Sequence, residues 1–210
     1  MHTERERTPQ TNLGTLRPAG KPRKSKEDEE NLKQTKTPHA TAVYEHFPEQ
    51  NIHVKETFNV AISKKKFQQK LVQTLLRVNC RTFTFEDVGN PTVPGCTVIF
   101  EFGIADSNSF NFISEREAEK MLTALNSESC KVMDFFCAIR YYKDYASSKK
   151  PLKFDYYMGR FVFTEENVLE LQVFHERGPR YVSPKDLTAF LQKKINEASA
   201  RGTLKKVEPL

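Results

Sequence analysis

The chain has 210 residues, 38% of them hydrophobic and 29% charged, with no tryptophan and a formal net charge of +6. This length allows one domain of ordinary size, and no stretch approaches the roughly 18 apolar residues of a membrane helix, so we expect no membrane partner. A basic chain is compatible with nucleic acid or with acidic protein surfaces, although +6 over 210 residues is a modest charge.

The first ten residues, MHTERERTPQ, lack the apolar core of a secretion signal, so we expect an intracellular protein. Reduced thiols suit that compartment. The four cysteines form no C-x-x-C pair, which argues against a zinc site and against redox chemistry. We interpret them as small core residues: Cys80, Cys96, Cys130 and Cys137.

Residues 1–40 contain no Val, Ile, Phe, Tyr or Trp and hold four of the eleven prolines. Such a segment buries too little apolar surface to offset the entropy lost on ordering, so we predict a disordered basic tail. Lys21, Arg23, Lys24 and Lys26 form a run typical of a nuclear-import signal, and a solvated mixed-charge tail is the alternative interpretation. We therefore expect a nuclear protein, with the cytoplasm as the alternative location.

Apolar periodicity predicts a strand and then a helix after the tail. In residues 51–62 the apolar positions alternate, which is the period of a strand. In residues 63–78 they recur every three or four positions, which is the period of a helix, and Ser63 is suited to cap the N-terminus of that helix.

The next part of the chain predicts three strands and a second helix. Aromatic residues alternate with polar ones in the strands, and a Pro- and Gly-rich connection separates the first two. Ser114 is followed three positions later by Glu117, a capping box that begins a helix over 114–126. The predicted strands cover 81–88, 97–105 and 109–113.

Residues 131–145 fit two structures. Val132, Phe135, Phe136 and Ile139 are spaced for a helix, whereas the aromatic and β-branched content of the segment suits a strand. We favour the helix and keep the strand as the alternative.

The rest of the chain predicts a β-hairpin and a last helix. Strands over 152–163 and 167–174 flank the turn TEEN, and Gly159 marks a bend or a bulge in the first of them. The last helix begins after Ser183, which caps it, and runs to about residue 198.

An internal echo appears when residues 99–122 are placed over residues 168–191. Ser114 then falls on Ser183, and apolar positions match apolar positions along both stretches. This self-similarity predicts two similar hairpin–helix halves, which cover 64–126 and 131–196. Coincidence between two ordinary hairpin–helix units is the alternative.

His175, Glu176 and Arg177 crowd together shortly before Ser183, which raises the question of nucleophilic catalysis. In the other half the matching positions hold Asp, Ser and Asn, which are turn formers, so we interpret the cluster as a turn and a helix cap. No nucleotide-binding loop, metalloprotease motif or nucleophile elbow occurs in the sequence. We therefore predict no catalytic residue, no metal ligand, no cofactor and no enzymatic activity.

These elements predict an α+β domain over 41–200, with antiparallel sheets and three to four helices, followed by a C-terminal tail over 201–210. The tyrosines of its strands exceed what one face of a sheet can bury. We therefore predict that Tyr141, Tyr145 and Tyr157 are interface aromatics.

The leading functional hypothesis is a non-catalytic protein-interaction subunit of a nuclear, chromatin-associated multiprotein complex. The first alternative is a nucleic-acid-binding protein. Lys64, Lys65 and Lys66 open a helix, where cations oppose the helix dipole, and Lys149 and Lys150 are further candidate contacts. The second alternative is an enzyme of unknown class, because the residues of an active site meet in space rather than in sequence.

Overall fold

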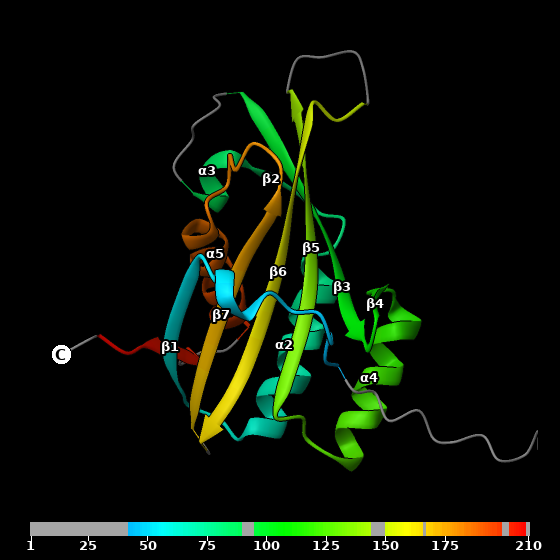
Figure 1. The fold of residues 1–210 in the computed structure, drawn as a ribbon, viewed down its shortest axis with the longest axis vertical. Coiled ribbons are helices and arrows are strands. Elements are labelled where there is room, and N and C mark those ends of the chain that lie inside the picture. The colour runs from blue at the N-terminus through cyan, green and yellow to red at the C-terminus, as the bar shows by residue number, and fades with distance from the viewer. Residues whose placement is uncertain (1–41, 90–94, 144–149, 166, 199–201, 209–210) are drawn as a thin grey trace, which may run out of the picture. The chain divides into compact units, whose positions relative to one another are not determined.

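In the described part of the chain, eight strands form one sheet, and the helices pack on one of its faces (Figure 1). The computed structural model describes residues 42–89, 95–143, 150–165, 167–198 and 202–208, all within the unit Pro38–Leu210. The strands are β1 (Val54–Val60), β2 (Thr82–Thr84), β3 (Cys96–Asp106), β4 (Ser109–Phe112), β5 (Val132–Lys143), β6 (Lys153–Glu165), β7 (Val168–Arg177) and β8 (Leu204–Lys206). The helices are α2 (Lys64–Val78), α3 (Phe85–Val88), α4 (Glu115–Ser127) and α5 (Pro184–Glu197), preceded by the 3₁₀ turn η1 (Glu49–Asn51).

The strand order is β2-β3-β5-β6-β7-β1-β8, with β4 paired to β3 beside this path. Every ladder between these strands is antiparallel. The predicted α+β class with antiparallel strands is therefore confirmed, with four helices in the described part of the chain.

Side chains alternate between the two faces of the sheet, because successive residues of a strand point to opposite sides. In β5 and β6 the odd-numbered residues point toward the helices, and Phe135, Tyr141, Tyr157 and Phe161 are buried there. The ring of Phe161 lies 6.4 Å from that of Phe67 in α2, so sheet and helix share one core. We call the opposite face, which the even-numbered residues of β5 and β6 occupy, the outer face.

The prediction of a helix over 131–145 is wrong, since Val132–Lys143 form strand β5. β5 lies between β3 and β6 and is covered on much of both faces, so most of its side chains are buried or half-buried. The sequence of a strand that is buried on both faces is a continuous apolar run, and periodicity cannot distinguish such a run from a buried helix.

Two predicted boundaries also differ from the structure. The strand predicted over 81–88 ends early, because Thr84 and Asp87 form the capping box of α3. Within the C-terminal tail predicted over 201–210, Leu204–Lys206 pair with β1 as β8. The tail predicted over 1–40 lies outside the described residues.

The two stretches of the internal echo agree in part. Ser114 Oγ accepts a hydrogen bond from Glu117 N at 3.2 Å, and Ser183 Oγ accepts one from Asp186 N at 3.0 Å, so each strand leads to a Ser-capped helix. The hairpin is not repeated, since β4 pairs with β3 whereas residues 178–183 form no strand.

Gly159 generates a prediction about the core. A Cβ placed there would lie 2.0 Å from Cζ of Phe135, whose ring rests on the glycine across the β5–β6 pair. We expect Gly159→Ala to lower the free energy of unfolding by about 1–3 kcal/mol, because the ring must move within a packed core. Urea unfolding of the purified chain measures this loss.

A double-variant cycle with Phe135→Leu tests the cause. If the ring is the obstacle, Gly159→Ala costs less in the Phe135→Leu background than in the native one. Equal costs in the two backgrounds would show that the clash is not what excludes a side chain at residue 159.

Candidate functional site

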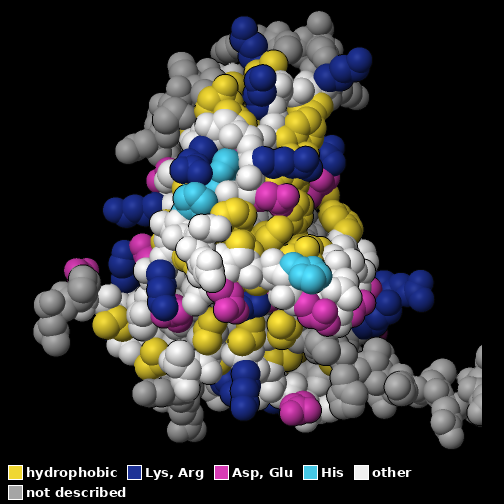
Figure 2. All heavy atoms as spheres, viewed as in Figure 1, with side chains coloured by type: hydrophobic (Ala, Val, Ile, Leu, Met, Phe, Trp, Pro, Cys, Tyr) yellow, Lys and Arg dark blue, Asp and Glu magenta, His cyan; other side chains and the backbone are white. Residues whose placement is uncertain are grey.

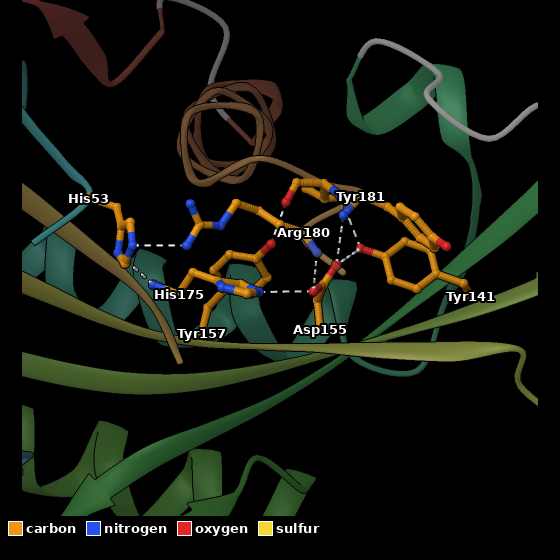
Figure 3. Close-up of polar contacts among 8 residues, drawn as sticks. His53, Tyr141, Asp155, Tyr157, His175, Arg180 and Tyr181 are labelled. Atoms are coloured by element: carbon orange, nitrogen blue, oxygen red, sulfur yellow. Dashed lines mark hydrogen bonds and ion pairs between the residues drawn. The ribbon is translucent and has the colours of Figure 1, made fainter. Parts of the chain in front are cut away.

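The carboxylate of Asp155 lies at the centre of a buried polar cluster at one end of the sheet (Figure 3). Its Oδ1 accepts hydrogen bonds from His175 Nε2 at 2.9 Å and from the backbone N–H of Arg180 at 2.7 Å. Its Oδ2 accepts from the Tyr141 hydroxyl at 2.6 Å and from the N–H of Tyr181 at 2.9 Å. Four donors therefore occupy a carboxylate that burial would otherwise make costly.

Two buried tyrosines extend this cluster toward the start of α5. The Tyr141 hydroxyl accepts a hydrogen bond from Val182 N at 3.1 Å, and the Tyr157 hydroxyl donates to the carbonyl oxygen of Val182. The pKa values of both phenols lie well above the usual range, mainly because of burial and further because of the neighbouring Asp155. Both hydroxyls therefore stay protonated and act as donors.

The loop over residues 178–183, which we call the anchored loop, lies directly against β6. A Cβ at Gly178 would be 2.3 Å from Asp155 Oδ1 and 2.3 Å from the carbonyl oxygen of Phe154. The φ angle of Gly178 is +119°, a region that side-chain-bearing residues rarely adopt. Glycine is thus the residue that lets the loop bring its amides to the carboxylate.

The arrangement of this cluster bears on catalysis. His175 is 6% exposed and bonded to a carboxylate, as a general base would be. The Ser183 hydroxyl, however, donates to Asp186 Oδ2 at 2.6 Å and caps α5. The hydrogen-bonding groups of Asp155 and Ser183 are therefore used within the fold, where they fix the anchored loop.

A second buried carboxylate holds the segment over residues 42–53, which we call the strap, on the outer face. Asp134 accepts hydrogen bonds from Arg160 Nε at 2.7 Å and from Tyr44 N at 2.8 Å. Arg160 also pairs with Glu49 at 2.6 Å, and its guanidinium lies 4.1 Å from the centre of the Phe47 ring. This network fastens the strap across the sheet, opposite the helices (Figure 1).

Half-buried aromatic side chains continue from the strap across the outer face. Consecutive ring centroids lie 4.6 Å, 5.5 Å, 5.9 Å and 6.1 Å apart. Figure 2 shows hydrophobic side chains gathered in a band on this face, with Lys and Arg around its upper part. We call this series of rings the aromatic strip: Tyr44, Phe110, Phe136, Tyr156 and Phe154.

The strip leads into an open groove of about 690 Å³ between β6 and the anchored loop. The guanidinium of Arg177 lies 4.4 Å from the centre of the Tyr156 ring. Leu152 is 51% exposed at the groove, so an apolar side chain faces solvent there. The lining residues are Leu152, Lys153, Phe154, Tyr156, Arg177, Gly178, Pro179 and Tyr181.

The tyrosines predicted for an interface need correction. Tyr141 and Tyr157 are 1% and 0% exposed, so the prediction that they are interface aromatics is wrong. The alternation of β5 and β6 turns both toward the helices, whereas their sequence neighbours Tyr142 and Tyr156 are half-buried on the outer face. Tyr145 lies outside the described residues.

The lysines predicted to contact nucleic acid or an acidic partner, as far as the structure describes them, do not line the groove beside the anchored loop. Lys64, Lys65 and Lys66 open α2 on the helix side, and Lys65 Nζ donates to the carbonyl oxygen of Asn126. Lys150 is exposed, close in sequence to Leu152. The remaining cations lie outside the described residues: Lys21, Arg23, Lys24, Lys26 and Lys149.

The sequence interpretation did not single out Asp155 or Asp134. The available signal was a charged residue inside a predominantly apolar strand, which is rarely buried unless it is paired. The partners of Asp155 come from β5, β7 and the anchored loop, so they could not be named without the fold.

Comparison with known proteins gives no match, either to a family model, to a curated protein or to a solved structure. Within the described ranges, no helix has the length and apolar character needed to cross a membrane. Over the same ranges, His, Cys, Asp and Glu side chains form no group of three or more that could hold a metal ion.

Asp155→Ala tests the structural role of the polar cluster. The substitution removes the acceptor of four buried donors, so we expect the free energy of unfolding to fall by about 3–5 kcal/mol. Urea unfolding measures the loss, and Glu176→Ala, which truncates an exposed carboxylate on β7, is the matched control. A loss of similar size in both variants would contradict the role of Asp155.

The histidine beside the cluster predicts a pH dependence. His53 is largely exposed, and its pKa is lowered, first by partial desolvation and then by the charge of Arg180. Its Nδ1 accepts a hydrogen bond from His175 N at 3.1 Å. Because the folded pKa is depressed, the unfolded chain binds the proton first, and stability is lost as pH falls below about 6.5.

We therefore expect the melting temperature to fall between about pH 7.5 and about pH 5.5, and to fall less in His53→Gln. The amide oxygen of glutamine can still accept a hydrogen bond but does not titrate. Thermal unfolding across this pH range makes the comparison, and identical pH profiles would exclude His53 as a source of the dependence.

Proposed function

We propose that the chain is a non-catalytic binding protein that joins a larger nuclear assembly by docking a protein partner on the outer face of its sheet. The observation that carries this proposal is the aromatic strip on the face opposite the helices. Tyr, Phe and Arg are enriched in protein interfaces, where rigid rings contribute contact area at a low entropic cost.

The strap supports this proposal, because it shows how the outer face holds a chain segment. Its Phe47 lies under the guanidinium of Arg160, and its Tyr44 packs against Phe110 with the ring centroids 4.6 Å apart and the planes tilted by 41°. The strap backbone also bonds to the turn between β3 and β4, as Glu45 N does to the carbonyl oxygen of Ser107 at 2.9 Å. A partner segment can use the same kinds of contact farther along the strip.

The edges of the sheet favour the face over strand addition as the mode of binding. The strand order ends in β2 and β8, which contain three residues each, and β4, which among the described strands pairs only with β3, contains four. β8 also carries the exposed cations Lys205 and Lys206. Short, charged edge strands discourage pairing with another chain.

Nucleic-acid binding is a second candidate function, because a cationic groove lies on the helix side. This groove of about 280 Å³ is lined by Lys66, Lys70 and Arg77 together with Gln69, Gln73, Thr74 and Ala198. Its described lining contains three cations and no carboxylate, which suits a phosphate backbone. The nuclear location stays a prediction, since the basic run between residues 21 and 26 lies outside the described residues.

Affinity purification of the full chain from cells, followed by mass spectrometry, tests the proposal. We expect a protein partner that is retained after nuclease treatment and lost in the double variant Phe154→Ala/Tyr156→Ala, because both rings belong to the aromatic strip. Val207→Ala is the matched control, since it truncates an apolar side chain that is 39% exposed beyond β8.

The outcomes separate the two candidate functions. Recovery of the native chain as a lone monomer, or of the same partner with the double variant, would overturn docking on the outer face. A partner that is lost on nuclease treatment and in Lys70→Glu would favour nucleic-acid binding through the groove of α2 instead. Thermal unfolding of each variant confirms that it is folded.

A further inference from the structure

We infer, on the basis of the proposed function, that the partner docks as an extended acidic peptide segment whose bulky apolar side chain enters the groove beside the anchored loop. The aromatic strip and the groove form one continuous surface, because Phe154 and Tyr156 belong to both. A segment that follows the rings from Phe110 to Phe154 covers about five or six residues, at roughly 3.3 Å per extended residue.

The wall of this groove is held rigidly by the polar cluster. Gly178 and Tyr181 line the groove and belong to the anchored loop, whose amides at Arg180 and Tyr181 bond to Asp155. A preformed wall lowers the entropy lost on binding, so a short segment can gain useful affinity there. The polar cluster thereby acquires a role in binding, although its atoms need not touch the partner.

Charge indicates the chemistry of the partner. Among the residues that the structure describes, Lys153 and Arg177 line the groove, and no Asp or Glu does. Nearby, Arg140 is paired with Glu101 at 2.6 Å, which leaves this pair close to neutral. Glu176 is exposed on β7 next to Arg177 and is the one exposed carboxylate adjacent in sequence to the described lining residues. The net charge of the lining is therefore positive and complements carboxylates of a partner.

The rings and the lining favour a peptide over single-stranded nucleic acid. Bases need an uncovered ring face for stacking, but the guanidinium of Arg177 already lies over Tyr156. The rings of Phe110 and Phe136 are tilted by 37° to each other, so the strip offers near-parallel rings only at Phe154 and Tyr156, whose planes differ by 9°. Leu152 and Pro179 in the lining suit an apolar side chain, and two cations offer few phosphate contacts.

Selection from a random peptide library tests this inference. The immobilised full chain is presented with an mRNA-display library of peptides about 12 residues long, twice the length that the strip requires. We expect the enriched peptides to combine Asp or Glu with Phe, Leu or another bulky apolar residue. Fluorescence anisotropy of the best enriched peptide then gives its dissociation constant for each variant.

We expect Arg177→Glu and Lys153→Glu each to weaken binding of that peptide by about tenfold or more, since each reverses a charge in the groove. Lys193→Glu, a charge reversal at an exposed position of α5, is the matched control and should change affinity less than about twofold. Raising NaCl from about 50 mM to about 300 mM should weaken the native complex as well.

The results distinguish failure of this inference from failure of the proposed function. Enriched peptides that are neutral or basic would overturn the acidic partner. So would peptides whose affinity is unchanged by both charge reversals but is lost with Phe154→Ala/Tyr156→Ala. Either result would leave docking on the outer face intact. Peptides whose affinity is the same for the native chain and for all three of these variants would overturn both the acidic partner and docking on the outer face. A fluorescent single-stranded oligonucleotide of about 12 nucleotides that binds in an Arg177-dependent way, when no peptide does, would replace the peptide with nucleic acid.

Discussion

The hydrogen bonds to the Asp155 carboxylate are the constraint on which this end of the molecule depends. They join β6 to β5 through Tyr141, to β7 through His175, and to the anchored loop through two backbone amides. A buried carboxylate without these donors would be strongly destabilising, so the four partners and the glycine that admits the loop form one unit. The same unit sets where α5 begins and what shape the groove has.

A second buried carboxylate, that of Asp134, fixes a segment to the outer face, as Asp155 fixes the anchored loop on the helix side. Asp134 and Asp155 lie on neighbouring strands and point to opposite faces, because one position is even-numbered and the other is odd-numbered. Each fixes an irregular segment to the sheet: Asp134 holds the strap through Tyr44 and Arg160, and Asp155 holds the anchored loop. The aromatic strip runs between these two fixed segments, which gives the proposed docking surface firm borders.

Sequence reasoning succeeded at the starts of two helices, where the physical signal was local, whereas Ser63, also expected to cap a helix, makes no side-chain cap hydrogen bond. Ser114 and Ser183 correctly predicted the starts of α4 and α5, because a cap side chain bonds to a backbone N–H only three residues away. It failed for β5, whose two buried faces hide the strand period, and it selected Tyr141 and Tyr157 although the neighbouring residue of each faces outward. The polar cluster and the groove were out of reach, since the partners of Asp155 converge from separate strands and a loop.

The position of β1 in the sheet has a consequence for synthesis of the chain. β1 pairs with β7 and β8, so Val54 lies opposite Val173 and Val60 opposite Leu204. β1 is therefore synthesised long before its partners, and until they emerge apolar residues such as Phe58 remain without their native cover. Pairing over such a sequence distance slows folding, because the chain must close a long loop before the contacts between these strands can form.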